Sequence, residues 1–319
     1  MKSINICILT VIIATLTACS VVDLRTGLSR TAPSTSIDAT FVKVIGNRGT
    51  SPGEFHRPEG ISVNRRGDVY VVDSGNERVQ KLDAEGVYIT EIGGFGWSAG
   101  QFNQPLGIDA TSGLDVWITD TQNRRIARMN ADLHWISSLT THNVDGISRD
   151  LGEPTGVAVS ADGWLWFTDR DEDRLRRLSP FSVGSETPSG SIGTGDLDNP
   201  SGIAIASDGT IYVADTGNDQ IAVYDQFGSF LNSIGRGFLK KPRGVTVTPL
   251  GDICIADTDN HRIVFCNRLG HLVGSFGSAG TGPGQFTRPS GVAVDRSGRV
   301  WVSDTGNNRL QILQLQRKT

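Results

Sequence analysis

The stretch that decides the fold is Arg288–Gln311, which reads RPSGVAVDRSGRVWVSDTGNNRLQ. Within it, Pro289 precedes Gly291 by two residues, and Asp304 follows that glycine by thirteen. The same arrangement of proline, glycine and aspartate occurs six times along the chain. Its glycines are Gly60, Gly107, Gly156, Gly202, Gly244 and Gly291, and its aspartates are Asp73, Asp120, Asp169, Asp215, Asp257 and Asp304. A repeat of 42 to 49 residues predicts a solenoid or a propeller.

Short runs of β-branched and aromatic residues fill each repeat. In the first repeat they occupy residues 61–63, 68–72, 78–82 and 87–92, with Gly, Asn and Asp turns between them. This pattern is typical of a four-stranded antiparallel meander. One meander cannot bury both of its faces, so the six copies must pack against one another. We therefore predict an all-β fold, a six-bladed β-propeller of four-stranded antiparallel blades over residues 40–317.

Two columns of residues at fixed offsets from the repeated Asp predict the packing between blades. Three residues before each Asp stand Tyr70, Trp117, Trp166, Tyr212, Cys254 and Trp301. Nine residues after each Asp stand Leu82, Met129, Leu178, Tyr224, Cys266 and Leu313. Because most of these side chains are large and apolar, we expect both columns in the core.

The sixth repeat has only three strands before the chain stops at Thr319. Residues 41–46 read FVKVIG, which matches the ends of other repeats, such as Ser275-Phe276-Gly277. We therefore predict that a strand at 41–45 lies beside Leu310–Leu315 and completes the last blade. This arrangement closes the ring and removes an exposed sheet edge.

The phrase at Arg288–Gln311 resembles NHL repeats, and the resemblance covers nearly all of the chain after residue 40. Departures exist: Glu172 stands where five repeats have Asn, and Gln220 stands where five have Arg. The resemblance implies a propeller. It leaves the function open, because the family includes binding and scaffold modules as well as relatives with lyase or hydrolase activity.

The N-terminus has a basic residue, Lys2, and then an apolar run from Ile4 to Ala18. This run is too short to span a membrane but suits a secretory signal peptide. The sequence Leu16-Thr17-Ala18-Cys19 resembles a bacterial lipobox, which implies cleavage of residues 1–18 and lipidation of Cys19. The alternative is a plain signal peptide with an incidental cysteine.

Residue Ser20 follows the cysteine, and by resemblance to Gram-negative sorting signals this favours the outer membrane over the inner one. Residues 19–39 are rich in Ser and Thr and are expected to form a flexible tether. We therefore expect a lipid-anchored protein of the bacterial cell envelope that faces the periplasm.

Two cysteines, Cys254 and Cys266, remain in the predicted propeller, on the two strands of one hairpin. Their positions are nearly opposite each other in that hairpin. Either a cross-strand disulfide or two buried thiols would fit, since an oxidising compartment permits the bond but its geometry is demanding.

The six repeated aspartates resemble a catalytic or metal-binding ring, but their neighbours favour a structural role. Asn stands three residues after Asp in five repeats, and Arg stands five residues after it in five repeats. A turn in which Asp accepts hydrogen bonds from backbone and Arg groups explains all three columns. No histidines form a close metal-ligand pair, and no nucleophile elbow or phosphate loop occurs. We predict no catalytic residue, no metal site and no cofactor.

Two further columns vary while their neighbours repeat. Between each Pro and Gly stand Glu59, Leu106, Thr155, Ser201, Arg243 and Ser290. Four residues after each Asp stand Glu77, Arg124, Asp173, Asp219, His261 and Asn308. Both columns should lie on one face of a propeller, and loops on a rigid scaffold often carry function. We predict a binding face formed by the first column together with Arg124 and His261.

These observations favour a binding or scaffold module for an envelope protein or peptide. A metal-dependent hydrolase or lyase at the axial mouth is the second candidate, and a sensor or carrier of small glycans is the third. Nucleic acid is not an expected partner, because the formal net charge is −4 and the chain carries an export signal.

Overall fold

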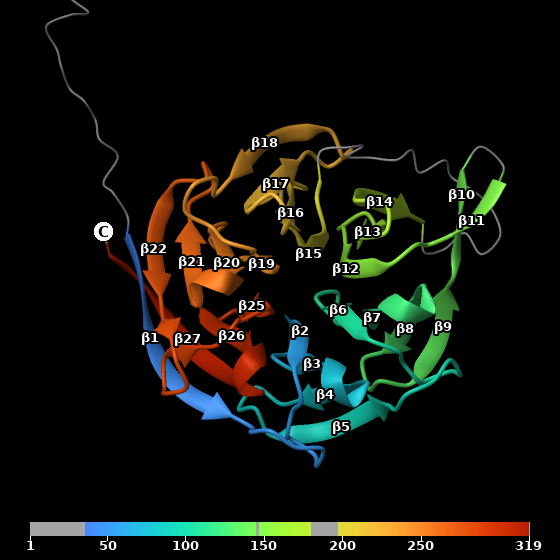
Figure 1. Ribbon diagram of the computed structural model, residues 1–319, viewed down its shortest axis with the longest axis horizontal. Helices are drawn as coiled ribbons and strands as arrows, with labels where there is room; N and C mark the ends of the chain where they lie inside the picture. The colour runs from blue at the N-terminus through green and yellow to red at the C-terminus, as the bar shows by residue number, and fades with distance from the viewer. Residues whose placement is uncertain (1–35, 145–146, 180–196, 319) are drawn as a thin grey trace, which may run out of the picture. The chain divides into compact units, whose positions relative to one another are not determined.

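Six antiparallel sheets form a ring in the computed structural model, as Figure 1 shows. The innermost strand of each of these sheets lines a central channel. The structure describes residues 36–144, 147–179 and 197–318. Each sheet is one blade, and its strands follow one another from the channel outwards. The predicted all-β, six-bladed propeller is therefore confirmed.

Four of the blades are meanders of four consecutive strands. Blade one contains β2 (Pro58–Val63), β3 (Val69–Asp73), β4 (Arg78–Leu82) and β5 (Tyr88–Gly93). Blade two contains β6 (Pro105–Asp109), β7 (Asp115–Asp120), β8 (Arg125–Asn130) and β9 (Trp135–Leu139). Blade four contains β15 (Pro200–Ile205), β16 (Ile211–Asp215), β17 (Gln220–Tyr224) and β18 (Phe230–Ile234). Blade five contains β19 (Gly244–Val247), β20 (Ile253–Asp257), β21 (Arg262–Cys266) and β22 (Leu272–Phe276).

Blade three shows three described strands, β12 (Pro154–Val159), β13 (Leu165–Asp169) and β14 (Arg174–Leu178). Its predicted fourth strand falls within 180–196 and lies outside the described residues. A hairpin of β10 (Thr141–Val144) and β11 (Ile147–Asp150) precedes the blade. Elsewhere, β23 (Ser278–Ala279) and β24 (Gln285–Phe286) form a short parallel pair in the loop before blade six.

Blade six is completed by the N-terminal strand. The blade contains β25 (Val292–Val294), β26 (Arg299–Asp304), β27 (Arg309–Lys318) and, at its outer edge, β1 (Ser36–Ile45). Phe41 pairs with Leu313 and Ile45 pairs with Leu310, which confirms the predicted closure. The strand begins earlier than predicted, because Ser36 pairs with Lys318 and so the tether boundary at residue 39 was wrong.

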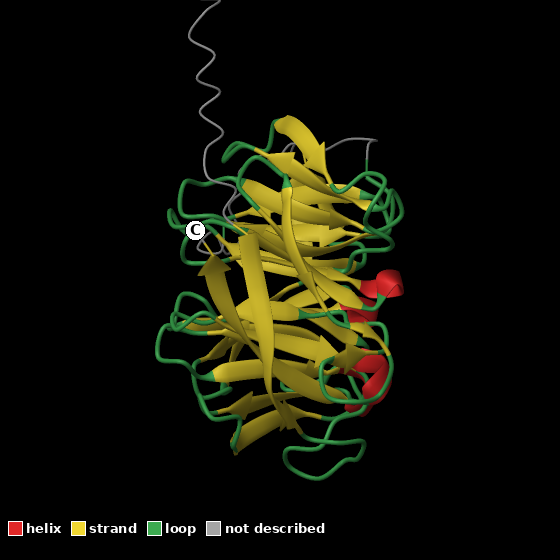
Figure 2. Cartoon of the chain, turned by 90° about the vertical axis from the view of Figure 1, so that its left-hand side faces the viewer, coloured by secondary structure: helices red, strands yellow, loops and turns green. Residues whose placement is uncertain are grey.

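Single turns of 3₁₀ helix join the second and third strands of four blades. They are η1 (Ser74–Asn76), η2 (Thr121–Asn123), η3 (Thr258–Asn260) and η4 (Thr305–Asn307). Figure 2 shows these turns on one face of the ring, which we call the mouth face. Strand β27 starts beside η4, and β1 runs antiparallel to it, so β1 begins on the opposite face. None of the described helices is long or apolar enough to span a membrane.

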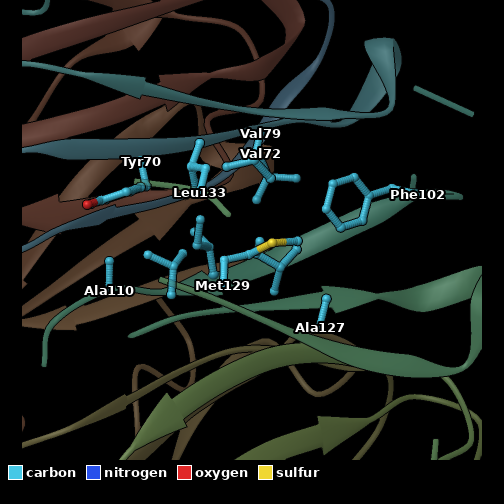
Figure 3. Close-up of a cluster of buried hydrophobic side chains, with 11 residues drawn as sticks. Tyr70, Val72, Val79, Phe102, Ala110, Ala127, Met129 and Leu133 are labelled. Carbon is cyan, nitrogen blue, oxygen red and sulfur yellow. The ribbon is translucent and has the colours of Figure 1, made fainter. Parts of the chain in front are cut away.

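The core consists of six apolar clusters, each between two neighbouring blades of the described chain. Figure 3 shows one of them, in which Tyr70 and Val72 of blade one lie near Met129 of blade two. Both predicted core columns are buried, except that Leu178 is half-buried. Burial of each large apolar side chain contributes roughly 1.5–3 kcal/mol, so the clusters hold the ring together.

The two cysteines are free, buried thiols in the structure, and the disulfide alternative is wrong. The register pairs Cys254 with Phe265, whereas Cys266 pairs with Ile253. This offset by one residue turns the two side chains to opposite faces of the blade. Cys266 lies in the cluster towards blade four, and Cys254 lies in the cluster towards blade six.

Candidate functional site

The repeated glycines allow neighbouring blades to approach each other closely at the wall of the channel. A Cβ atom on Gly202 would lie 2.5 Å from the carbonyl oxygen of Arg243, in the next blade. The other five glycines face the equivalent carbonyl of their own next blade at 2.2–2.4 Å, including Gly291, which faces Glu59 across the ring closure. Only a residue without a side chain allows this approach. The glycines therefore bring the residues between Pro and Gly close to the axis.

A cavity of about 380 Å³ opens on the mouth face at the axis. All six residues between Pro and Gly line it, and we call them the mouth ring: Glu59, Leu106, Thr155, Ser201, Arg243 and Ser290. The first of the two predicted columns is thus brought together in one place, with one residue from each blade.

The floor of the cavity is aliphatic. One residue after each repeated glycine, a β-branched side chain lines the cavity: Ile61, Ile108, Val157, Ile203, Val245 and Val292. The same six residues also line a narrower cavity of about 170 Å³ further along the channel. A ligand that reaches beneath the mouth ring therefore meets an apolar ring with one side chain from each blade.

Glu59 and Arg243 form an ion pair inside the cavity, between blades one and five. The Arg243 Nη1 atom lies 3.3 Å from Oε2 and 3.4 Å from Oε1 of Glu59. Glu59 is only 4% exposed, and Arg57 also approaches its carboxylate, at 3.8 Å. The pair places both charge signs at the wall of one small cavity.

The hydroxyl groups of the mouth ring bond to neighbouring blades. Thr155 Oγ1 donates to the carbonyl of Pro200 at 2.8 Å, and Ser201 Oγ donates to the carbonyl of Arg243 at 2.9 Å. Ser290 Oγ donates to the carbonyl of Glu59 at 3.3 Å. These three side chains therefore join blades, and the ligand-facing chemistry of the ring rests on Glu59, Leu106 and Arg243.

Three more cations line the cavity: Arg170, Lys241 and Arg288. Each has a carboxylate partner. Arg170 pairs with Glu153, just before its own blade, at 2.7 Å. Lys241 and Arg288 pair with residues of the preceding blade, Asp219 at 3.9 Å and Asp259 at 3.4 Å. These three residues were not predicted from the sequence as part of the site. Arg170 carried a usable signal, because it follows the repeated Asp where the other blades have Ser74, Thr121, Thr216, Thr258 and Thr305.

The second predicted column does not line the cavity. We call it the rim ring: Glu77, Arg124, Asp173, Asp219, His261 and Asn308. Five of its members accept a hydrogen bond from the backbone N–H of the residue before the next blade's Pro. For example, His261 Nδ1 accepts from Arg288 N at 3.0 Å, and Asn308 Oδ1 accepts from Arg57 N at 2.9 Å. The same bond is made by Glu77, Asp173 and Asp219. His261, which was predicted as part of the binding face, is half-buried at a blade junction and does not line the cavity.

Arg124 is the exception in the rim ring, because its guanidinium has no acceptor atom. At this junction the backbone N–H of Glu153 donates instead to Asp169 Oδ1, at 3.1 Å. Arg124 pairs with Asp171 of blade three at 3.3 Å, with both side chains about half exposed. Arg124 was also predicted at the mouth, but it lies on the rim, outside the residues that line the cavity.

The repeated aspartates have the structural role that the sequence indicates. Asp120 is fully buried; its Oδ1 accepts from Asn103 N at 2.7 Å, and its Oδ2 accepts from Asn123 Nδ2 at 2.8 Å and Arg125 Nε at 2.6 Å. Burial raises the pKa of Asp120 and of its counterpart Asp215. These carboxylates hold a loop and a turn of their own blade together, away from the cavity.

One more buried carboxylate, Asp109, lies beside the narrower part of the channel. Burial raises its pKa. Its Oδ1 accepts from Thr111 N at 2.8 Å, and its Oδ2 accepts from Val159 N of blade three at 2.7 Å. It therefore joins two blades. Within the described residues, no group of three or more His, Cys, Asp or Glu side chains gathers to hold a metal ion.

Comparisons with known sequences identify the repeat. The NHL repeat profile matches four segments, residues 55–82, 197–224, 239–264 and 286–313. A segment of 42 residues is 43% identical to the B-box type zinc finger protein ncl-1 of Caenorhabditis elegans. That match covers 13% of this chain and 5% of ncl-1, so the chain matches only a small part of that relative.

Solved structures share the fold at low sequence identity. A gluconolactonase of Xanthomonas campestris is 17% identical with a TM-score of 0.65, over 88% of this chain and 98% of its own. An aldose sugar dehydrogenase of Streptomyces coelicolor is 15% identical with a TM-score of 0.61, over 88% and 98%. A virginiamycin B lyase of Staphylococcus aureus is 16% identical with a TM-score of 0.56, over 88% and 99%. The chain therefore contains NHL repeats, folded into a six-bladed β-propeller.

Proposed function

We propose that this protein is a binding module of the cell envelope that takes a short segment of a protein or peptide partner into its axial cavity. The observation that carries the proposal is the convergence of Glu59, Leu106 and Arg243 on one cavity. The residue at this position differs between blades, whereas the Pro and the Gly on either side of it are repeated in every blade. Variable loop residues on a rigid scaffold often determine which ligand a protein binds.

The size of the cavity supports a short segment as the ligand. Ligand pockets in proteins typically measure roughly 300–1,000 Å³. The cavity here, at about 380 Å³, is near the lower end of that range. It admits a few residues or a small molecule, whereas a folded domain could contact only the rim. Its aliphatic floor and few polar groups are also typical of binding pockets.

The N-terminal sequence supports a location in the bacterial cell envelope. We propose that Cys19 carries the lipid and anchors the protein in the outer membrane, facing the periplasm. Several acyl chains on one cysteine would give durable anchoring.

A second candidate is a metal-dependent hydrolase or lyase that acts at the same mouth. Its support is the propeller fold shared with a gluconolactonase and a virginiamycin B lyase. At 16–17% identity this similarity concerns the fold alone. Elemental analysis of the purified protein separates the candidates: stoichiometric zinc or calcium, lost together with an activity on chelation, would favour the enzyme.

The binding proposal is tested by affinity capture from envelope extracts with the full chain as bait. We expect Glu59→Ala combined with Arg243→Ala to lose the captured partner. The matched control is Arg66→Gln, which removes a charge from an exposed turn on the opposite face. Unchanged capture by the double variant would show that the mouth is not the binding site.

A further inference from the structure

We infer that the segment held in the mouth is a chain end: a C-terminal α-carboxylate on a residue with an aliphatic side chain. This inference rests on the proposed function and specifies the ligand of the same cavity. Three observations support it: the position of Arg243, the aliphatic floor of the cavity, and the existing hydrogen bonds of the other polar groups in the cavity wall.

The first step identifies the cation that can reach a ligand. Arg170 and Lys241 are held by short bonds, to Glu153 at 2.7 Å and to the carbonyl oxygen of Gly217 at 3.0 Å. The Arg288 side chain is 60% exposed and lies towards solvent. Arg170 is the most firmly held, because both Nε and Nη2 donate to Glu153 Oε2, at 3.0 and 2.7 Å. Arg243 differs, because its contact with Glu59 spans blade six and uses Nη1. Among the described residues, Nε and Nη2 of Arg243 have no partner and can bind a second carboxylate.

The second step concerns the strength of the existing pair. Charge-assisted N–H···O bonds typically measure about 2.7–2.9 Å. The Arg243 contacts to Glu59, at 3.3 and 3.4 Å, are longer, and Arg57 shares the same carboxylate. A ligand carboxylate can therefore compete for the guanidinium of Arg243 without breaking a short bond. Glu59 would oppose that ligand, because like charges repel across the small cavity.

The third step relates the cation to the floor. Val245 is the second residue of β19, which Arg243 directly precedes, and Ile61 follows Glu59 by two residues in β2. All four residues line the mouth cavity, but only Ile61 and Val245 also line the narrower cavity further along the channel. The aliphatic ring therefore lies deeper in the channel than the charged pair. A ligand whose carboxylate binds Arg243 can therefore place an adjacent apolar group against the aliphatic ring.

The fourth step matches this arrangement to chain chemistry. Asp and Glu side chains end in their carboxylate and carry only one or two methylene groups beside it. A C-terminal Leu, Ile or Val instead bears a carboxylate and an aliphatic side chain on one carbon. The backbone N–H of that residue then points back towards the mouth, where the partner chain continues. Free aliphatic amino-acid derivatives share this chemistry, and the experiment separates them from a chain end.

The experiment measures binding of fluorescent peptides to the purified full-length protein. The probe is an N-labelled Gly-Ser-Gly-Ala-Leu peptide with a free C-terminal carboxylate, and its matched control is the same peptide as the C-terminal amide. We expect amidation to weaken binding roughly 10- to 100-fold, the loss of one charge-assisted contact. A free carboxylate on a final Ser should also weaken binding. N-acetyl-leucine as a competitor shows whether the end residue alone suffices.

Two variants that each remove one charge test the sign of the charge. We expect Arg243→Gln to weaken binding of the carboxylate peptide to the level of the amide. We expect Glu59→Gln to strengthen binding, since it removes the repulsion. A cationic ligand would give the opposite pair of effects, and Arg66→Gln should change neither. Circular dichroism of each variant excludes loss of the fold.

The outcomes separate this inference from the proposed function. Equal affinity for the acid and the amide, or Glu59→Gln weakening the acid, would overturn the chain-end inference. If partner capture still depends on Glu59 and Arg243, the binding proposal survives such a result with a different ligand. If the peptides bind as expected but capture does not depend on the mouth, the envelope partner binds elsewhere.

Discussion

The mouth ring and the rim ring lie on the same face, and both vary in sequence from blade to blade. The rim ring contains Glu77, Asp173, Asp219, His261 and Asn308, which differ in size and charge but all accept one backbone N–H from the next blade. Its variety therefore serves one structural task. The mouth ring differs, because its charged and apolar members face a cavity. Variation in a repeat indicates specificity only where the varied atoms are not already bonded to the frame.

The largest effect should come from the buried frame that supports both rings. Asp120→Ala would leave Arg125, which is 7% exposed, without its carboxylate partner. Removing one member of a buried pair costs about 3–5 kcal/mol of the free energy of unfolding, so the protein should unfold at a lower urea concentration. The matched control is Asp171→Ala on the rim, where the half-exposed pair with Arg124 contributes about 0–1 kcal/mol. Equal losses in the two variants would mean that the rim is as important to folding as the frame.

The glycines that form the mouth give the next effect. Gly202→Ala places a methyl group 2.5 Å from a backbone carbonyl, which cannot move without shifting the next blade. Such overpacking costs about 1–3 kcal/mol. In the control, Gly282→Ala, the new Cβ would meet only the end of the Gln285 side chain, at 3.0 Å. If urea denaturation shows no difference between the two, close packing does not explain the repeated glycine.

A smaller effect tests the shared task of the rim ring directly. His261→Asn keeps a side-chain acceptor and copies Asn308 of blade six, whereas His261→Ala removes the partner of Arg288 N. We expect the alanine variant to lose about 0.5–1.5 kcal/mol in thermal or urea unfolding, and the asparagine variant to lose less. Two equally destabilised variants would show that the imidazole ring, and not the acceptor, matters at this junction.

The smallest effect concerns two frame residues that solvent should not reach. Burial raises the pKa of Cys266 to about 12, and burial also raises the pKa of Cys254 well above its usual range. An ordinary thiol is half ionised near pH 8.5, roughly, and reacts there as the thiolate. We expect iodoacetamide at that pH to leave both thiols unmodified in the folded protein and to label both in urea. Mass spectrometry that finds one intramolecular disulfide would contradict the observed register.

Much of the frame could be predicted from the sequence because its chemistry repeats. Six copies of Pro, Gly and Asp fixed the blade number, and the phrase at 41–45 indicated the closing strand. The start of that strand was harder to predict, because Ser36–Thr40 follows a Ser- and Thr-rich stretch and has only two apolar residues, Ile37 and Ala39, which pack in the cluster between blades five and six. Register was harder still: a shift of one residue separated Cys254 from Cys266.

The site was predicted in part. The mouth ring could be found because the residue between Pro and Gly must lie next to a close glycine contact. The rim ring was misread, because acceptors as different as Glu77 and His261 look unrelated until their shared backbone partner is seen. Arg170 was harder to predict because its only signal is that it replaces Ser or Thr in the column directly after the repeated Asp.

The measurement that tests the central claim most directly is photo-crosslinking in intact cells, with a photoreactive residue at one position of each ring. Leu106 represents the mouth ring, and Arg124, whose side chain makes no bond to the next blade's backbone, represents the rim ring. We expect a specific partner adduct from position 106 that disappears when Arg243→Gln is added, and little adduct from position 124. A strong adduct at 124 together with none at 106 would contradict the claim that the axial cavity is the binding site.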